Sequence, residues 1–117
     1  MAKVLIVDDE QGVCRMLGKY FSSKGFAVKS AFSGEQGLAT LDEGPFDVVL
    51  IDILLPGIHG LEMLKRAKKL NPMARVAMIT GLHDDDLRAE ARAAGADAYV
   101  TKPFNFAEPV WSMLAAP

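Results

Sequence analysis

The chain has 117 residues, of which 50% are hydrophobic and 24% are charged, a balance that excludes a disordered segment and fits one globular domain. The 13 basic residues are scattered and are outnumbered by 15 acidic ones, which argues against a nucleic-acid-binding domain. The one cysteine, Cys14, cannot form an internal disulfide, and no apolar run reaches the length of a membrane span, so we expect a cytoplasmic protein.

Short apolar runs alternate with amphipathic stretches from one end of the chain to the other. The apolar runs predict five strands, at residues 3–7, 26–32, 47–51, 75–80 and 97–101. The amphipathic stretches predict five helices: one with an apolar stripe over 13–21 that ends at Gly25, three over about 34–43, 58–70 and 84–94, and a short one from about Asn105. Gly25 is expected to end the first helix in a left-handed conformation.

This alternation predicts a parallel sheet with right-handed crossovers and helices on both of its faces. The runs at 3–7 and 47–51 are the most apolar and belong at the centre, whereas Lys29 and Ser30 place the second strand at an edge. We therefore expect a doubly wound α/β fold with strand order 2-1-3-4-5, a flavodoxin-like three-layer sandwich formed by residues 1–117 as one domain.

Polar side chains follow four of the predicted strands. Asp8 and Asp9 follow the first strand, Asp52 follows the third, Thr80 ends the fourth, and Lys102 comes directly after the fifth. Neighbouring strands are roughly 4.8 Å apart, so the three aspartates would share one cleft, and their repulsion should raise the pKa of at least one carboxyl. Oxygen ligands of this kind suit Mg²⁺ or Mn²⁺, and Lys102 and Thr80 would complete a site for a phosphoryl group on an aspartate.

Other acids, histidines and the cysteine have simpler explanations. An aspartate pair such as Asp8-Asp9 is most often a helix cap or a solvated loop, and only the predicted proximity of Asp52 favours a metal. The acidic run at 84–86 fits the first turn of a helix, so we expect no second metal site there. His59 and His83 have no partner at zinc-ligand spacing and should be loop residues. Cys14 should be a small buried side chain.

The ordered set of motifs resembles the receiver domain of two-component response regulators. The motifs are "VLIVDDE" at 4–10, "VVLIDILLPGIHGLEML" at 48–64, "VAMITG" at 76–81 and "AAGADAYVTKPF" at 93–104. The resemblance covers nearly the whole chain. It implies that Asp52 is the phosphoacceptor and that Asp9, Asp52 and the backbone carbonyl of Leu54 bind Mg²⁺, with Asp8 acting through a metal-bound water.

The resemblance also implies roles for the residues on the last two strands. Lys102 would contact a phosphoryl oxygen, and Thr80 would move to meet another once Asp52 is phosphorylated. Tyr99 would be the aromatic residue whose ring position follows the active state. The peptide bond between Lys102 and Pro103 is expected to be cis, an isomer that the tertiary amide makes accessible.

The function that follows is a signalling switch that takes a phosphoryl group from a sensor histidine kinase or a phosphotransfer protein. The domain would catalyse its own phosphorylation and a slow dephosphorylation, because the apolar Leu54 and Leu82 flank the path of an attacking water. It would not be a turnover enzyme. The resemblance allows a homodimer through the face from the fourth strand to the fifth helix, and implies no direct contact with nucleic acid or membrane.

Three other functions fit the sequence less well than this switch does. A phosphatase with a nucleophilic aspartate would need a second acid two residues after Asp52, where the chain has Leu54. A flavin-binding protein would need a loop of Ser, Thr and Gly after the first strand, where the chain has acids. A receiver-like interaction module that is never phosphorylated would not need the complete set of acids, threonine and lysine.

The last segment departs from the family pattern. Asn105 and Glu108 predict an N-cap and its partner, so that Pro109 would fall inside the fifth helix and remove one helical hydrogen bond. The chain stops almost as this helix completes, which favours a domain excised from a larger protein over a stand-alone one.

Overall fold

The computed structural model describes residues 1–117, and its five strands form one parallel sheet in the order β2-β1-β3-β4-β5. The strands are β1 (Lys3–Val7), β2 (Ala27–Ala31), β3 (Val48–Asp52), β4 (Arg75–Thr80) and β5 (Ala98–Thr101). The strand order and the parallel pairing confirm the fold expected from the sequence.

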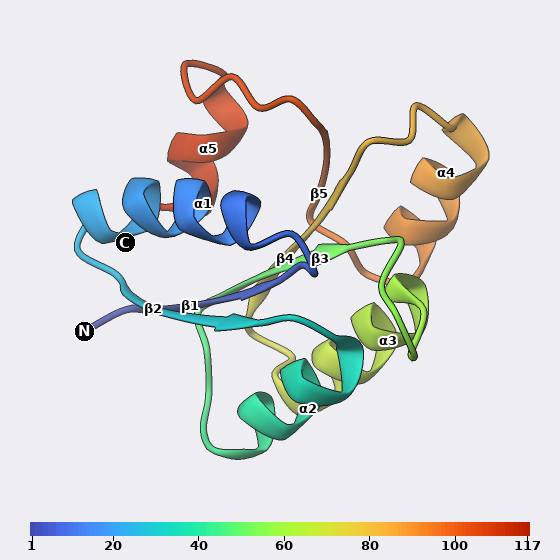
Figure 1. Ribbon diagram of the computed structural model, residues 1–117, viewed down its shortest axis with the longest axis horizontal. Coiled ribbons are helices and arrows are strands. Elements are labelled where there is room, and N and C mark those ends of the chain that lie inside the picture. The colour runs from blue at the N-terminus through green and yellow to red at the C-terminus, as the bar shows by residue number, and fades with distance from the viewer.

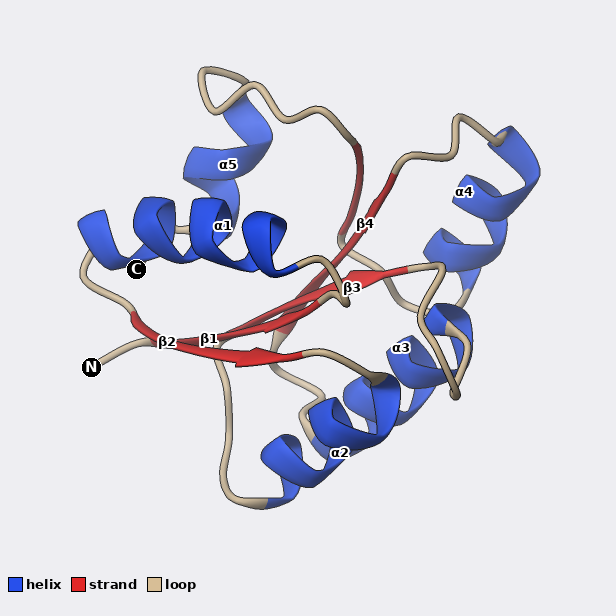
Figure 2. Cartoon of the chain, viewed as in Figure 1, coloured by secondary structure: helices blue, strands red, loops and turns tan.

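Five helices alternate with the strands and cover both faces of the sheet. They are α1 (Gln11–Ser23), α2 (Gly34–Asp42), α3 (Gly60–Leu70), α4 (Asp85–Ala93) and α5 (Pro109–Leu114). Helices α1 and α5 lie on one face, and α2, α3 and α4 lie on the other, so that the sheet is the middle of three layers (Figures 1 and 2). None of these helices combines the length and the apolar character that crossing a membrane requires.

A hydrophobic cluster fills the space on each side of the sheet. In β1, Leu5 and Val7 belong to the cluster under α2, α3 and α4, whereas Val4 and Ile6 belong to the cluster under α1 and α5. All four side chains are fully buried, and each such burial contributes about 1.5–3 kcal/mol. Burial on both faces explains why β1 is an uninterrupted apolar run. Polar side chains can reach solvent only where the strand ends.

The end of α1 and the start of α4 agree with the sequence prediction. Gly25 has a φ of +88°, and this left-handed conformation turns the chain away from α1 after the helix ends, as expected. The acidic run before α4 is a cap, because the Asp84 side chain accepts hydrogen bonds from the backbone N–H groups of Asp86 and Leu87. No second metal site is needed to explain these acids.

The predicted starts of α5 and α3 were wrong. The helix α5 begins at Pro109 and not near Asn105, whose side chain accepts a hydrogen bond from Ala107 N in a preceding turn. Proline disfavours a helical conformation in the residue before it and fits the first helical position, where its missing N–H removes no helical bond. The helix α3 begins at Gly60, because His59 has an extended backbone and its ring nitrogen caps Leu61 N.

The short α5 is held by aromatic packing and by Arg75. Tyr20 of α1 stacks on Phe106 at 4.8 Å between ring centroids, and Trp111 of α5 packs against the same pair. The Arg75 guanidinium donates to the backbone carbonyls of Met113, Leu114 and Ala116 at and just after the end of α5, where helical carbonyls run out of partners within the helix. These contacts fix α5 against the first helix and the start of β4.

Candidate functional site at the carboxyl ends of the strands

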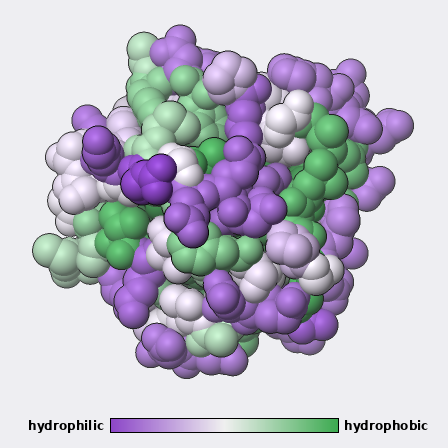
Figure 3. Space-filling view, viewed as in Figure 1, coloured by the Kyte–Doolittle hydropathy of each residue, from purple (hydrophilic) through white to green (hydrophobic).

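The polar residues that follow β1, β3, β4 and β5 meet at one edge of the sheet. Val7 pairs with Ile51 in the β1–β3 ladder, so Asp8 and Asp52 come directly after paired positions. After β1 the chain turns to one face of the sheet, and after β3 it turns to the other. Ligands of such sheets bind at this point, outside the carboxyl ends of the strands. Hydrophilic surface covers the middle of the view in Figure 3, where the ends of β1 and β3 lie in Figure 1.

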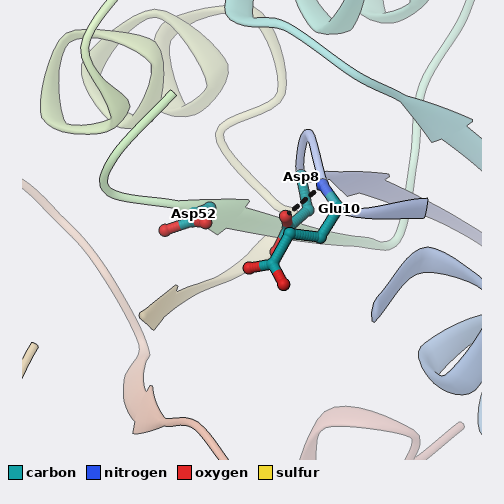
Figure 4. Close-up of side chains that lie close together, drawn as sticks. All are labelled: Asp8, Glu10 and Asp52. Carbon is teal, nitrogen blue, oxygen red and sulfur yellow. Dashed lines mark hydrogen bonds between the residues drawn. The ribbon is translucent and has the colours of Figure 1, made fainter. Parts of the chain in front are cut away.

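Asp8, Glu10 and Asp52 form an acidic cluster at this edge. One carboxylate oxygen from each residue lies within 4.8 Å of the other two. Figure 4 shows the three side chains grouped at the ends of β1 and β3. The Asp8 side chain is fully buried and that of Asp52 is 7% exposed, whereas Glu10 is 63% exposed. The cluster therefore has a buried floor and one side chain open to solvent.

Lys102 is the cation that all three carboxylates share. Its Nζ lies 2.9 Å from Asp8 Oδ2, 2.9 Å from Glu10 Oε1 and 3.1 Å from Asp52 Oδ2. Burial alone would lower the pKa of Lys102, but the hydrogen bonds to Glu10, Asp8 and Asp52 outweigh burial and raise it. Lys102 therefore stays charged, and one positive charge faces three acids.

Asp8 is the most constrained member of the acidic cluster. Its Oδ1 accepts a hydrogen bond from Glu10 N at 2.9 Å, drawn as the dashed line in Figure 4. Its Oδ2 lies 2.9 Å from the Lys102 ammonium and has no partner besides it. Burial raises the pKa of Asp8, with a smaller contribution from the Asp52 charge. The expected rise in pKa is present, although burial and not repulsion is its main cause.

The donor set of the acidic cluster fits a hard divalent cation. All of its ligand atoms are carboxylate oxygens, and the one Lys102 ammonium leaves the three acids with excess negative charge. Asp9 is exposed and makes no hydrogen bond or ion pair within the chain, so the structure does not bring it into the cluster. Its role as a metal ligand stays a prediction.

Glu10 is the site residue that sequence reasoning missed. In the sequence it stands only as the last residue of the motif "VLIVDDE", with no predicted role. Its carboxylate reaches the acidic cluster because Glu10 stands directly before α1 with an extended backbone, φ −87° and ψ 108°. The sequence separation of 92 residues between Glu10 and its partner Lys102 hides this contact from local patterns.

The loop from Ile53 to His59 folds back onto Asp52. The backbone N–H of Leu54 donates to Asp52 Oδ1 at 3.2 Å, which holds the carboxylate in place. The Leu54 side chain is 56% exposed and stands at the rim of the site. The loop that carries the expected third metal ligand therefore begins in contact with the expected phosphoacceptor.

Thr80 and Tyr99 are linked through Leu82. Thr80 is fully buried at the end of β4, and its Oγ1 accepts a hydrogen bond from Leu82 N at 3.1 Å. The Tyr99 hydroxyl donates to the Leu82 carbonyl at 3.1 Å, and the Arg88 guanidinium lies 4.7 Å from the Tyr99 ring. Burial raises the pKa of Tyr99, so this hydroxyl remains a donor. One loop residue thus joins the two side chains that the sequence resemblance pairs.

The remaining reactive side chain and the cis bond agree with the simpler expectations. Cys14 is buried, its thiol donates to the Asp8 carbonyl at 3.4 Å, and burial raises its pKa, which makes it a poor nucleophile. The peptide bond between Lys102 and Pro103 is cis, the isomer that the resemblance implies.

Comparison with known proteins places the chain among signalling proteins. Residues 4–110 match the family described as the response regulator receiver domain. The chain is 35% identical over 106 residues to sporulation initiation phosphotransferase F of Bacillus subtilis, covering 91% of this chain and 86% of that protein. It is 34% identical over 104 residues to the uncharacterized transcriptional regulatory protein YcbL of the same organism, covering 89% of this chain. It spans about half (46%) of the length of that regulator.

Solved structures agree with this family and fold. A CheY-like response regulator receiver domain protein of Methanospirillum hungatei superposes with a TM-score of 0.89 and 32% identity, covering 97% of this chain and 90% of that one. A response regulator of Burkholderia pseudomallei, solved with a phosphorylated aspartic acid and a calcium ion, superposes with a TM-score of 0.87 and 28% identity. That comparison covers 99% of this chain and 66% of that one.

Proposed function

Because the chain belongs to the family of response regulator receiver domains, we propose that it accepts a phosphoryl group on Asp52 and changes its surface in response. The observation that carries the proposal is the position of Asp52. Its carboxylate ends the central strand β3, is 7% exposed, and lies 3.1 Å from the Lys102 ammonium. A nucleophilic carboxylate beside a fixed cation is what transfer of a phosphoryl group to an aspartate requires.

The residues of the site divide the work of this transfer. An Asp52 carboxylate oxygen forms the new bond to phosphorus while the bond from phosphorus to the donor's histidine nitrogen breaks, and that nitrogen leaves with the electron pair. Lys102 neutralises charge on the phosphoryl oxygens. Asp9, Asp52 and the Leu54 carbonyl would hold Mg²⁺ or Mn²⁺, with Asp8 acting through a water. When bound, the metal supplies further positive charge for the phosphoryl oxygens.

The response to phosphorylation would pass through the loop after β4. Thr80 would give up its bond to Leu82 N to donate to a phosphoryl oxygen, and Tyr99 would follow because it is bonded to the same residue. The affected surface would be the face from β4 to α5, through which a homodimer would be possible. This coupling is a two-state element that phosphorylation biases towards one arrangement.

The partners follow from this chemistry. The phosphoryl donor would be a sensor histidine kinase or a phosphotransfer protein of the cytoplasm. The related regulator YcbL is about twice as long as this chain, and any DNA binding would belong to such additional segments rather than to this domain. The domain would regulate rather than turn over a substrate. Slow dephosphorylation would follow from Leu54 and Leu82, which offer no group to orient an attacking water.

The proposal is tested by incubating the chain with acetyl phosphate and Mg²⁺ and recording its intact mass. The wild type should gain one phosphoryl group, and Asp52→Ala should gain none. Asp47→Ala is the matched control, because Asp47 precedes the same strand at the opposite edge of the sheet, and this variant should be phosphorylated normally. A wild type that gains no mass would favour a receiver-like interaction module that is not phosphorylated.

A further inference from the structure

Glu35 joins the start of α2 to the loop that follows Asp52. It is the second residue of α2, and its Oε1 accepts a hydrogen bond from the backbone N–H of Ile58 at 2.8 Å. Ile58 lies near the end of the loop between β3 and α3. The acceptor is an ionised carboxylate, so this is one of the stronger classes of hydrogen bond in proteins.

Two glycines let the carboxylate approach this loop. Gly57 has a φ of +75°, and a methyl group on its Cα would collide with the Glu35 carboxylate. Gly34 precedes Glu35, and a methyl group there would lie 2.8 Å from Ile58 Cβ. The backbone on each side of the contact therefore has no room for a side chain, and the loop and the helix start are fitted to one another.

Between its ends the loop donates few backbone hydrogen bonds, while its Leu55 and Ile58 side chains pack against the core under α2, α3 and α4. Among residues 54–58, the backbone N–H groups that donate within the chain are those of Leu54, to Asp52 Oδ1, and Ile58, to Glu35 Oε1. Glu35 is thus the only residue of another helix or strand that receives a hydrogen bond from this stretch. The Leu54 carbonyl therefore lies between two backbone hydrogen bonds, one from Leu54 N to Asp52 and one from Ile58 N to Glu35.

We infer that Glu35 is a positioning residue for the phosphorylation site, because it fixes the loop that presents the Leu54 carbonyl to a divalent cation. The inference rests on the proposed function. Groups that orient metal ligands without touching the metal typically change affinity or activity by about 10–100-fold when removed. Glu35 acts at the lower end of this range, since the loop keeps its bond to Asp52.

A set of three variants separates a positioning role of Glu35 from a role in the stability of the fold. Glu35 also places a negative charge in the first turn of α2, where the helix dipole favours it. Glu35→Gln removes this charge but keeps an oxygen that can accept from Ile58 N, whereas Glu35→Ala removes both. Asp47→Ala is a matched control, because Asp47 is also exposed and accepts a backbone N–H, that of Lys3, at 2.7 Å, at the opposite edge of the sheet.

The first measurement uses the metal-free protein and reads hydrogen exchange of individual backbone amides by NMR. Glu35→Ala should speed exchange of the Ile58 amide by about tenfold and loosen its neighbours in the loop, while Glu35→Gln stays within about twofold of the wild type. Asp47→Ala should leave this amide unchanged. Equal exchange in Glu35→Ala and the wild type would overturn the inference.

The second measurement is the Mg²⁺ concentration that gives half of the maximal rate of phosphorylation by acetyl phosphate. Glu35→Ala should raise it about tenfold, and Glu35→Gln and Asp47→Ala should leave it within about twofold of the wild type. A wild type that is phosphorylated together with an unchanged Glu35→Ala would overturn the inference and leave the proposed function standing. A wild type that takes up no phosphoryl group would overturn both.

Discussion

At the amino-terminal edge of the sheet each acidic side chain has its own donors, whereas at the carboxyl-terminal edge three carboxylates share one lysine. Asp47 accepts from Lys3 N at 2.7 Å, and Asp97 Oδ2 accepts from Val76 N at 2.8 Å and from Lys68 Nζ at 3.1 Å. These bonds tie strand starts to neighbouring strands and to α3. The polar groups of this edge are paired in a way that stabilises the fold.

The carboxyl-terminal edge leaves negative charge unpaired. Asp8, Glu10 and Asp52 all contact the Lys102 ammonium, and the buried Asp8 Oδ2 has no partner besides this shared cation. Such an arrangement disfavours folding unless another cation binds. The difference between the two edges indicates that one serves stability and the other serves a ligand.

The largest effect is expected from Lys102→Met in metal-free solution. The substitution leaves three clustered carboxylates without a cation, and the free energy of unfolding should fall by about 2–3 kcal/mol. Lys68→Met at the opposite edge should lose only about 1 kcal/mol, since its ion pair with Asp97 is partly exposed. Urea denaturation measures both, and equal losses would show that the two edges do not differ.

The second largest loss of stability is expected from removing Asp97, whose hydrogen bonds stabilise the amino-terminal edge of the sheet. Asp97→Ala leaves the Val76 N–H and the Lys68 ammonium without their partner, and the free energy of unfolding should fall by about 1–2 kcal/mol. Added Mg²⁺ should not restore it. If Mg²⁺ restored the stability of this variant, metal binding would not be confined to the carboxyl-terminal edge, and the comparison would be contradicted.

Asp52→Asn should change the stability of the metal-free protein by no more than about 0.5 kcal/mol, in either direction. The amide oxygen can still accept from Leu54 N, and one of the repelling charges is removed. The wild type should gain melting temperature with increasing Mg²⁺, and the variant should lose most of that gain. A strongly destabilised variant that still responds to Mg²⁺ would contradict the metal role of the acidic cluster.

The smallest effect is a pH dependence that Asp8 confers on the metal-free protein. Its pKa is raised in the folded state, so the folded protein binds this proton more tightly than the unfolded chain does. Wild-type stability should therefore rise relative to Asp8→Asn as the pH is lowered from neutral towards the ordinary value of 3.8. The raised pKa of Lys102 adds stability that is fully present at these pH values and is lost only at strongly alkaline pH.

Urea denaturation of the wild type and Asp8→Asn at several pH values, with a chelator present, checks this sign. A constant difference between the two proteins across that range would mean that Asp8 titrates as it does in the unfolded chain.

The sheet and most of the site could be predicted because both depend on local patterns. Uninterrupted apolar runs identify β1 and β3 as central strands, and parallel strands bring their carboxyl ends to one edge, so the positions of Asp8, Asp52, Thr80 and Lys102 at that edge follow from the sequence. Features that depend on where a helix begins were less accessible. Glu10 enters the acidic cluster because of the backbone just before α1, and α5 begins at Pro109 because proline fits the first helical position.

Contacts that depend on how a loop is placed could not be predicted. The bond from Ile58 N to Glu35 joins residues 23 positions apart, and its geometry depends on how α2 lies against the loop after β3. The two bonds at Leu82 likewise require the loop after β4 to be placed against Tyr99. Spacing along the chain specifies which strand a residue follows, but it does not specify which loop a side chain reaches.

The central claim is that Asp52 is the residue that carries the phosphoryl group. Incubation with acetyl phosphate and Mg²⁺, reduction of the acyl phosphate with borohydride, and peptide mass mapping locate the modified residue directly, because reduction converts a phosphorylated aspartate to homoserine. The account predicts homoserine at position 52, and none at Asp8, Asp9 or Glu10 of the same site. Reduced product at any other acid, or none in the wild type, would contradict it.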